Sequence, residues 1–290
     1  MECIPCFVRQ AEEAVAFATK DLVRREKILR QILHALADAD WVASPPAIAQ
    51  RLHRIIRKET GEPDPYRAVK DRMNGLALEA LTCCANSIAA AADPREAAVR
   101  VAVAGNLLDS GAKIQIQPEN LPQLLATLWD RPLAGDPHEL FRAAEKAERI
   151  LYLADNAGEI VFDRLLLNFL PIEKVTLAVR GRPILNDALR RDAELAGFTG
   201  LIPVIDNGSD APGTVLEDCS EEFRGYFERA DLIISKGQGN YETLSSVSAP
   251  VFFLFAVKCP IVAAQVGEPT GTMVAKKSAR WAEGQHVQHL

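Results

Sequence analysis

The stretch LYLADNAGEIVFD, residues 151–163, joins a short apolar run to an acidic residue, an amide and a glycine. The apolar run is unbroken, as in a strand buried on both faces of a parallel sheet. Asp155 and Asn156 follow directly, where such a strand is expected to end. A carboxylate and a carboxamide therefore stand side by side at the end of a buried strand.

Further apolar runs follow this one, with helical stretches between them. With the first, the runs read RILYLA, KVTLAV, GLIPVI, ADLIIS and APVFFLFAV. This alternation is typical of a mostly parallel sheet that is covered by helices on both faces. The sequence thus predicts an α/β domain over residues 148–290.

The first part of the chain, residues 1–147, has the pattern of a helical bundle. Its expected helices start with a capping oxygen followed by proline, at Ser44-Pro45, Asp64-Pro65, Asp93-Pro94 and Asp136-Pro137. After the second start, apolar residues recur every three or four positions, as on the buried face of a helix. We therefore expect two domains that pack tightly, with the boundary near residue 147.

Composition excludes several classes of partner. The chain of 290 residues carries a net charge of -6 with both signs interspersed, and it has no basic stripe that would bind nucleic acid. No apolar run reaches the roughly 18 residues needed to span a bilayer, and no secretory leader opens the sequence. We expect a cytoplasmic protein without nucleic-acid or membrane partners. The sequence leaves the oligomeric state open.

Six cysteines are expected to be reduced thiols, because a chain of this size does not need disulfide staples. Cys3 and Cys6 form a CxxC motif, which is half of a zinc site or a redox pair in other proteins. No second CxxC or histidine pair stands at zinc-finger spacing. Packing is therefore the simpler interpretation, and the role of Cys3 and Cys6 stays open.

Polar clusters follow all of the expected strands. They are Asp155-Asn156, Arg180-Gly181-Arg182, Asp206-Asn207-Gly208, the run from Lys236 to Asn240, and Lys258-Cys259. The carboxyl ends of parallel strands line one edge of a sheet, and ligands bind in the crevice there. Any one polar loop needs no function, but acidic groups, cations and glycines together favour a shared site at this edge.

The residue types indicate chemistry on phosphate. Asp155, Asn156 and Asp187 offer hard oxygen donors of the kind that bind Mg²⁺ or Mn²⁺. Lys236 and Arg180 offer positive charge to an anion. A divalent ion can polarise a phosphoryl oxygen and activate a water, so hydrolysis of a phosphoester is the natural reaction.

Other phosphate-binding and hydrolytic devices are missing from the sequence. It has no GxxxxGK[ST] loop, no complete GxGxxG fingerprint and no GxSxG elbow. The first strand ends in Asp-Asn-Ala rather than Asp-x-Asp, which argues against an aspartyl-phosphate intermediate. A water activated by a metal is therefore the expected nucleophile.

Several motifs, in order along nearly the whole chain, resemble the DUF89 family of metal-dependent damage-control phosphatases. They are CIPC, GNLLDSGA, DNAGEI, RGRPILND, IDNGSDAPGT, SKGQGNYE and FFLFAVKC. The amino-terminal CxxC is similar to that of the stand-alone prokaryotic branch. The resemblance implies a helical bundle domain packed on a Rossmann-like three-layer α/β domain, with a metal at the carboxyl ends of the strands.

The resemblance also implies roles for individual residues. It identifies Asp155, Asn156 and Asp187 as metal ligands. Lys236 and Asn240 match residues that contact the substrate phosphate. Glu159 follows on the same turn as the first two ligands, and we expect it to orient the attacking water.

Four further residues are candidates for substrate binding. Asn106 and Asp109 of GNLLD are three apart and share one face of a helix, so they could reach the site from the helical half. A polar helix end that closes at Gly111 explains them equally well. Arg180 and Asp206 follow the second and third expected strands and have less support from motifs.

The sequence thus predicts a hydrolase: a phosphatase that uses Mn²⁺, Co²⁺, Ni²⁺ or Mg²⁺ to act on small phosphorylated metabolites. The resemblance points to sugar phosphates or damaged cofactor-precursor phosphates, without fixing the substrate or the metal. One alternative is a non-catalytic sensor that binds a metal and a phosphometabolite. A methyltransferase dependent on S-adenosylmethionine is a weaker one, because only Gly158 is present where a glycine-rich loop would follow the first strand.

Overall fold

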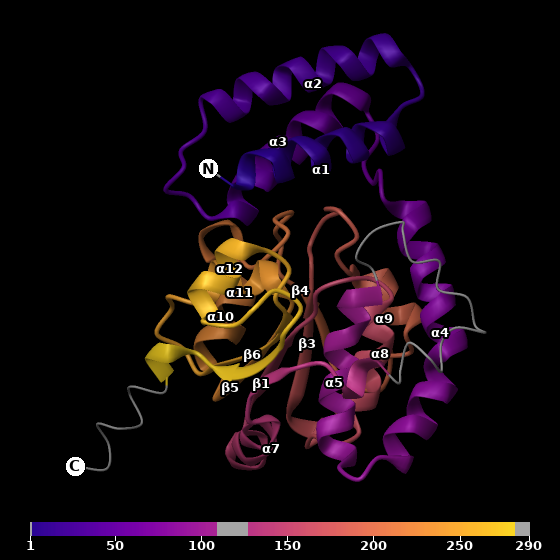
Figure 1. The fold of residues 1–290 in the computed structure, drawn as a ribbon, viewed down its shortest axis with the longest axis vertical. Helices are drawn as coiled ribbons and strands as arrows, with labels where there is room; N and C mark the ends of the chain where they lie inside the picture. Colours follow the sequence, from indigo (N-terminus) through magenta and orange to yellow (C-terminus); the bar gives the residue numbers. More distant parts are fainter. Residues whose placement is uncertain (1, 109–126, 282–290) are drawn as a thin grey trace.

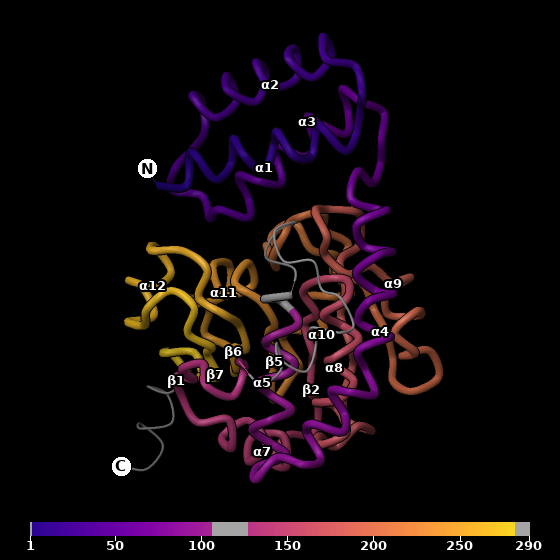
Figure 2. The backbone as a smooth tube through the Cα atoms, turned by 45° about the vertical axis from the view of Figure 1, so that its right-hand side comes forward, coloured from indigo at the N-terminus to yellow at the C-terminus, as the bar shows by residue number. Residues whose placement is uncertain are grey.

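The computed structural model describes residues 2–108 and 127–281, apart from the side chains of residues 106–108. Its first three helices are α1 (Cys3–Ala18), α2 (Leu22–Ala37) and α3 (Pro45–Thr60). They pack around a core of their own, to which α1 contributes Phe7 and Val15 and α3 contributes Ile56. We call these three helices the helical module. Figures 1 and 2 show it at one end of the molecule, above the rest of the chain.

At two of the four predicted sites, an aspartate before proline caps the start of a helix through its side chain. Asp93 and Asp136 each accept a hydrogen bond from the backbone two residues on, at the starts of α5 (Pro94–Leu108) and α7 (Pro137–Lys146). Asp64-Pro65 does not start a helix, because α4 (Arg67–Ala90) begins two residues later. The Asp64 carboxylate is instead buried and lies 2.6 Å from the Nζ of Lys70.

In the described part of the chain, seven strands form one sheet in the order β1-β7-β6-β5-β2-β3-β4. They are β1 (Leu133–Gly135), β2 (Ile150–Leu153), β3 (Val175–Val179), β4 (Val204–Asp206), β5 (Leu232–Lys236), β6 (Val251–Ala256) and β7 (Met273–Lys277). Neighbouring strands run parallel except β6 and β7, which are antiparallel. The predicted mostly parallel sheet is confirmed.

Helices cover both faces of this sheet (Figure 1). One face packs against α4, α5, α7, α8 (Glu159–Leu167) and α9 (Arg190–Leu195). The other packs against α10 (Glu221–Arg229), α11 (Gln238–Leu244) and α12 (Pro260–Val266). Successive strand residues alternate between the two cores, so Tyr152 faces the first and Leu151 the second. The result is the expected three-layer Rossmann-like arrangement.

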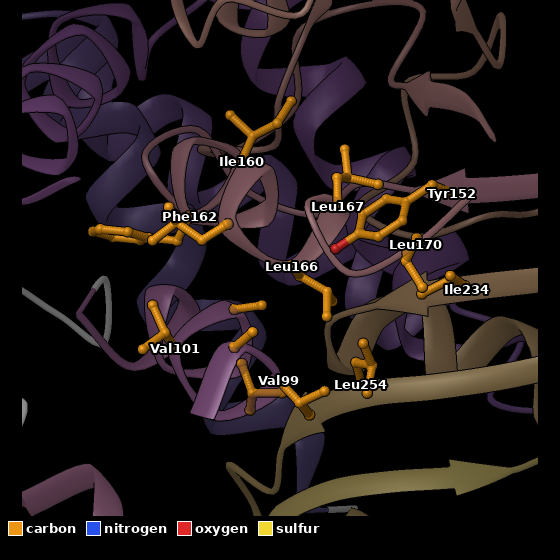
Figure 3. Close-up of a cluster of buried hydrophobic side chains, with 14 of the residues drawn as sticks. Val99, Val101, Tyr152, Ile160, Phe162, Leu166, Leu167, Leu170, Ile234 and Leu254 are labelled. Atoms are coloured by element: carbon orange, nitrogen blue, oxygen red, sulfur yellow. The ribbon is translucent and has the colours of Figure 1, made fainter. Parts of the chain in front are cut away.

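The larger core joins elements from both halves of the sequence. Figure 3 shows Val99 and Val101 of α5 beside α8 residues such as Phe162 and Leu166, and Ile234 and Leu254 of the sheet nearby. Because α4 and α5 share this core with the sheet, the expected boundary at residue 147 divides elements that pack together. The strand β1 also precedes that boundary and pairs with β7. Among the described residues, the helical module has a core apart from the two that cover the faces of the sheet.

A polar clamp holds the helical module on the sheet. Arg57 of α3 forms an ion pair with Asp210, which lies in the loop after β4. Gln50 donates one hydrogen bond of 2.7 Å to Asp210 and another of 2.7 Å to Asp218, and Arg54 pairs with both carboxylates. This clamp fixes the module over the carboxyl ends of the strands. None of the described helices is long and apolar enough to cross a membrane.

Candidate active site

The site lies where the chain changes direction across the sheet. From β2 the chain continues to β3 on one side, and it later returns to β5 on the other side. In open α/β sheets, ligands bind at the carboxyl ends of the strands beside such a switch point. Asp155 follows β2 and Gly237 follows β5, so both stand at this point.

The backbone after β5 approaches Asp155 very closely. A Cβ atom on Gly237 would lie 1.9 Å from Oδ2 of Asp155, and the φ angle of Gly237 is +81°. A side chain here would meet the carboxylate and would also strain the backbone. Glycine at position 237 therefore leaves the room that Asp155 occupies.

A loop after β3 brings Asp187 to the same place. Residues 156 and 187 form an isolated antiparallel bridge. The Ala188 N–H donates to the Asp155 carbonyl at 2.8 Å, and the Ala157 N–H donates to the Asn186 carbonyl at 2.9 Å. These backbone bonds place Asp155, Asn156 and Asp187 together, although 30 residues lie between Asn156 and Asp187 in the sequence.

These three side chains line a cavity of about 390 Å³ between the sheet and the helical module. We call it the strand-end cavity. Loops after the strands and the start of α11 form one wall. The module forms the other, mainly through Cys3, Cys6, Phe7, Gln10, Pro45 and Pro46. The shared site that the polar clusters predict is thus a cavity with one polar wall from the sheet and one wall from the module.

Arg180 lies behind the two carboxylates and is itself buried. Its Nε donates to Oδ2 of Asp187 at 2.7 Å, and its Nη2 lies 3.9 Å from Oδ1 of Asp155. Burial and the nearby Asp155 charge raise the pKa of Asp187 to about 7, against the opposing effect of Arg180. The pair of carboxylates is therefore short of positive charge.

The amide of Asn156 has a fixed orientation. Its Nδ2 donates to Oδ2 of Asp155 at 2.9 Å and to Oε2 of Glu159 at 3.1 Å. Two carboxylates thus take both amide hydrogens, which leaves Oδ1 as the free end of the group. Asn156 accordingly offers an oxygen, not a nitrogen, to a ligand.

Lys236 does not line the strand-end cavity. Its buried Nζ lies 2.6 Å from Oε1 of Glu159, 2.5 Å from Oδ1 of Asp163 and 3.0 Å from the Ala102 carbonyl. The two carboxylates raise the pKa of Lys236 above its ordinary value even though burial lowers it. The expected contact with the substrate phosphate stays a prediction, and in the structure Lys236 binds Glu159, the carboxylate that holds Asn156.

Glu159 is also buried, at the first position of α8. Burial raises its pKa to about 8, while Lys236 acts in the opposite direction. Because Glu159 does not line the cavity, it reaches the site through Asn156. The expected contact with an attacking water stays a prediction.

Asn240 and Arg180 belong to one buried network. Oδ1 of Asn240 accepts from Thr214 Oγ1 at 2.8 Å and from Arg180 Nη2 at 3.2 Å. Its Nδ2 donates to the Lys236 carbonyl at 2.8 Å. Asn240 therefore braces Arg180 and the turn after β5 and does not line the cavity.

The remaining predicted residues lie elsewhere. Asp206 ends β4 at the edge of the sheet, where it accepts hydrogen bonds from Arg190 and from the Gly208 N–H. Asp206 does not line the strand-end cavity. Asp109 lies outside the described residues, as does the side chain of Asn106, whose backbone belongs to α5.

Sequence reasoning missed the contribution of α1 and of Glu242 in α11 to the cavity. Gln10 of α1 and Glu242 of α11 both line it, and burial raises the pKa of Glu242 to about 7. The available signal was the CxxC motif, since Cys3 and Cys6 share the cavity with Cys259. All three are free thiols, and burial raises the pKa of Cys3 and of Cys6.

The donor set fits a hard divalent cation. Within the described ranges, no group of three or more His, Cys, Asp or Glu side chains is arranged to hold a metal ion. Asp155 and Asp187 do offer two carboxylates, and the orientation of Asn156 adds an amide oxygen. Oxygen donors of this kind suit Mg²⁺ and Mn²⁺, and a cation would offset the paired negative charges.

Comparisons with known proteins agree with this architecture. A damage-control phosphatase of Pyrococcus horikoshii is 33% identical over 96% of this chain and 97% of that protein. One of Archaeoglobus fulgidus is 37% identical over 79% of this chain and 81% of that protein. The crystal structure of a DUF89 family protein from Pyrococcus horikoshii superposes with a TM-score of 0.86 at 33% identity, covering 96% of this chain and 98% of that one.

The match extends over almost the entire sequence. An uncharacterized protein of Methanocaldococcus jannaschii is 34% identical over 95% of this chain and 94% of that protein. Residues 1–274 match the family described as the damage-control phosphatase ARMT1-like domain. The chain therefore belongs to the DUF89 family of damage-control phosphatases.

Proposed function

We propose that this protein is a phosphatase that depends on a divalent metal and hydrolyses small phosphorylated metabolites, such as sugar phosphates or damaged cofactor-precursor phosphates. One observation carries the proposal: Asp155, Asn156 and Asp187 converge on the wall of one cavity at the switch point of the sheet. The names of the Pyrococcus and Archaeoglobus relatives support the same class of activity.

Asp155, Asn156 and Asp187 would hold the cation through their side-chain oxygens. When bound, a divalent cation supplies positive charge that polarises a phosphoryl oxygen and favours ionisation of the attacking water. Mg²⁺, Mn²⁺, Co²⁺ and Ni²⁺ all accept oxygen ligands, and geometry and availability decide among them.

The other residues of the site position these ligands. Glu159 holds the amide of Asn156 so that its oxygen is the exposed end, and Lys236 holds Glu159. Arg180 fixes the Asp187 carboxylate and adds positive charge close to Asp155. We assign Lys236 to this supporting role in place of direct contact with phosphate.

The reaction is hydrolysis of a phosphomonoester. The oxygen of a water forms a bond to phosphorus, the bond between phosphorus and the ester oxygen breaks, and a proton passes to the departing alcohol. The protein's contribution is to hold the phosphoryl group against Asp155, Asn156 and Asp187 while the module covers the cavity.

The direct test measures release of inorganic phosphate from para-nitrophenyl phosphate and from a panel of sugar and cofactor-precursor phosphates. The protein is first treated with a chelator and then supplied with Mg²⁺, Mn²⁺, Co²⁺ or Ni²⁺. We expect turnover only with metal. Asp155→Asn and Asp187→Asn should lower kcat/KM more than about 100-fold, because each removes a charged ligand.

Asp231→Asn is the matched control, since Asp231 lies at the opposite end of β5 and pairs with Arg149 near the surface. It should leave kcat/KM within about twofold. Absence of turnover by folded, metal-supplied protein would contradict a phosphatase. Binding of metal and phosphate esters without turnover would favour a sensor instead.

A further inference from the structure

Asn74 is a buried amide in α4 that does not line the strand-end cavity. Its Oδ1 accepts a hydrogen bond from the Gly158 N–H at 2.7 Å, and its Nδ2 donates to Oδ1 of Asp192 at 2.8 Å. Both bonds are shielded from water, so losing either one would leave a buried polar group unpaired, which is costly.

The first bond holds the turn that carries Asp155 and Asn156. Gly158 ends this turn directly before α8, with a φ of +76°. A Cβ atom on Gly158 would lie 3.0 Å from the Cβ of Met73, so α4 packs closely against the turn. The next residue, Glu159, accepts a hydrogen bond from Nδ2 of Asn156. A shift of Gly158 would therefore move Glu159 and release the amide of Asn156.

The second bond leads to the loop that carries Asp187. Asp192 is buried in α9, and its Oδ2 accepts a hydrogen bond from the Leu189 N–H at 2.8 Å. Leu189 stands two residues after Asp187. Asn74 and Asp192 thus connect the end of one segment with candidate ligands to the end of the other. We call this pair of side chains the Asn74 bridge.

The Asn74 bridge also ties both segments to the packed core. The backbone bonds from Ala157 to Asn186 and from Ala188 to Asp155 join the two segments to each other. The bridge adds α4, whose buried residues after Asn74 belong to the larger core. Hydrogen bonds of this kind, outside the ligands themselves, keep ligands from different loops in one geometry.

We propose that Asn74 is a positioning residue for the cation site, where its bridge to Asp192 sets the place of Asp155 and Asn156 relative to Asp187. This inference rests on the proposed function, because the cation belongs to that proposal. Removing such an outer hydrogen-bond partner typically lowers metal affinity about 10-fold to 100-fold.

The first test titrates the metal-free protein with Mn²⁺ and follows the free ion by electron paramagnetic resonance. Asn74→Leu keeps a branched side chain and removes both hydrogen bonds, so the Kd for Mn²⁺ should rise about 10-fold to 100-fold. Ile88→Ala is the matched control, because Ile88 is buried in the same helix, roughly 21 Å farther along its axis. It should destabilise the fold but leave the Kd within about twofold.

A double variant tests the bond between Asn74 and Asp192. Asn74→Asp keeps an acceptor for the Gly158 N–H but sets two carboxylates against each other, and it should also raise the Kd. Adding Asp192→Asn reverses donor and acceptor in the 2.8 Å bond and leaves an oxygen for the Leu189 N–H. The double variant should return the Kd to within about threefold of the wild-type value. A double variant as weak as Asn74→Asp would overturn the role of this bond.

Hydrogen exchange of the metal-free protein gives a second readout. Asn74→Leu should speed exchange in residues 154–160 and 186–192 more than in the rest of the sheet, whereas Ile88→Ala should not single out these segments. Uniform acceleration would mean that Asn74 serves stability alone, and it would overturn the proposal. If Asn74→Leu does not fold, as judged by circular dichroism, Asp192→Asn weakens the same bridge and should give the same pattern of exchange.

The failures of the two proposals can be distinguished. A wild-type protein that binds Mn²⁺ and releases phosphate, with an equal Kd in Asn74→Leu, would overturn the role of Asn74 and leave the phosphatase intact. A wild-type protein that binds no divalent cation and hydrolyses no phosphate ester would overturn the phosphatase and the role of Asn74 with it.

Discussion

The two walls of the strand-end cavity are built in different ways. Behind the wall from the sheet, the buried Arg180 and Glu159 hold the lining residues Asp187 and Asn156 by hydrogen bonds of 2.7 Å and 3.1 Å. In the wall from the helical module, apolar groups and thiols predominate, and the buried Oε1 of Gln10 has no hydrogen-bond partner among the described residues. Under the proposed function, the first wall would hold the phosphoryl group and the second would lie against the rest of the substrate.

The difference follows from the size of the cores. Burying several ionised groups carries a large desolvation cost, which only a large packed core can offset. The sheet and its helices form two cores, whereas the module has one small core and is held by the Asp210 clamp. The charged site therefore belongs to the sheet, and the module adds shape.

The largest expected effect on stability comes from breaking the charge network under the sheet wall. Lys236→Met would leave the buried carboxylates of Glu159 and Asp163 without their cation. We expect a loss of about 3–5 kcal/mol in the free energy of unfolding, measured by urea denaturation. Activity should fall too, because Glu159 then no longer holds Asn156 in place.

Lys276→Met is the control for this substitution. Lys276 pairs with Glu268 at 2.7 Å, but both side chains are about one-third exposed. Water screens that pair, so the loss should stay below about 1 kcal/mol. Equal losses for the two lysines would show that burial does not distinguish them.

The next effect tests the close approach of β5 to the site. Gly237→Ala places a methyl group on Asp155, at a φ of +81°. We expect a loss of about 2–3 kcal/mol in stability and at least about a tenfold loss in kcat/KM. Gly267→Ala has a similar φ of +75° with no atom within 4 Å of the new Cβ, so it isolates the backbone cost of about 1 kcal/mol. If both variants kept full activity, Asp155 would not need the space at Gly237.

The clamp offers a way to weaken the module alone. Asp210→Ala removes the carboxylate shared by Arg54, Arg57 and Gln50. Because Arg54 is partly exposed, the expected loss is about 2 kcal/mol rather than the full cost of a buried pair. Hydrogen exchange followed by mass spectrometry should show faster exchange in α1–α3 and little change in β2 and β5. Equal acceleration in both regions would mean that they unfold as one unit.

Acid should also loosen the module. Burial, together with Arg57, lowers the pKa of His53 in α3 from 6.5 to about 3. The unfolded chain therefore binds a proton that the folded module does not, so stability is complete above pH 6.5 and falls as the pH drops toward 3. We expect a loss of about 1 kcal/mol at pH 5.5 from this group. The free energy of unfolding is measured by urea denaturation at pH 7.5 and at pH 5.5. His53→Gln should reduce the difference between the two values by about 1 kcal/mol, and an unchanged difference would contradict the role of His53.

Much of the fold is readable from the sequence because strands buried on both faces are apolar throughout. Strands β2 and β6 have this property, and the runs that contain them predict the sheet. Strand β1 does not, since three residues reading LAG carry no pattern. Strand β7 ends in two lysines that are only partly buried, and it runs antiparallel to β6, so it differs from the repeated unit.

The site was less predictable because the sequence pattern does not reveal the order of the strands in the sheet. Polar residues after each strand look equivalent along the chain, but β4 lies at the edge of the sheet and its Asp206 ends up away from the cavity. The direction of the Lys236 side chain depends on α8, where Glu159 and Asp163 are four residues apart and share one face. Only packing reveals that both carboxylates face the same lysine.

Helix α1 contributes residues both to the core of the helical module and to the strand-end cavity. Phe7 and Ala11 enter the core of the module, while Cys3, Cys6 and Gln10 border the cavity. Exchanges on the bordering side can thus change the shape of the cavity without altering Asp155, Asn156 or Asp187, or the core of the module. Replacing the module with that of a relative is accordingly a practical way to change the substrate specificity while keeping the sheet and its site.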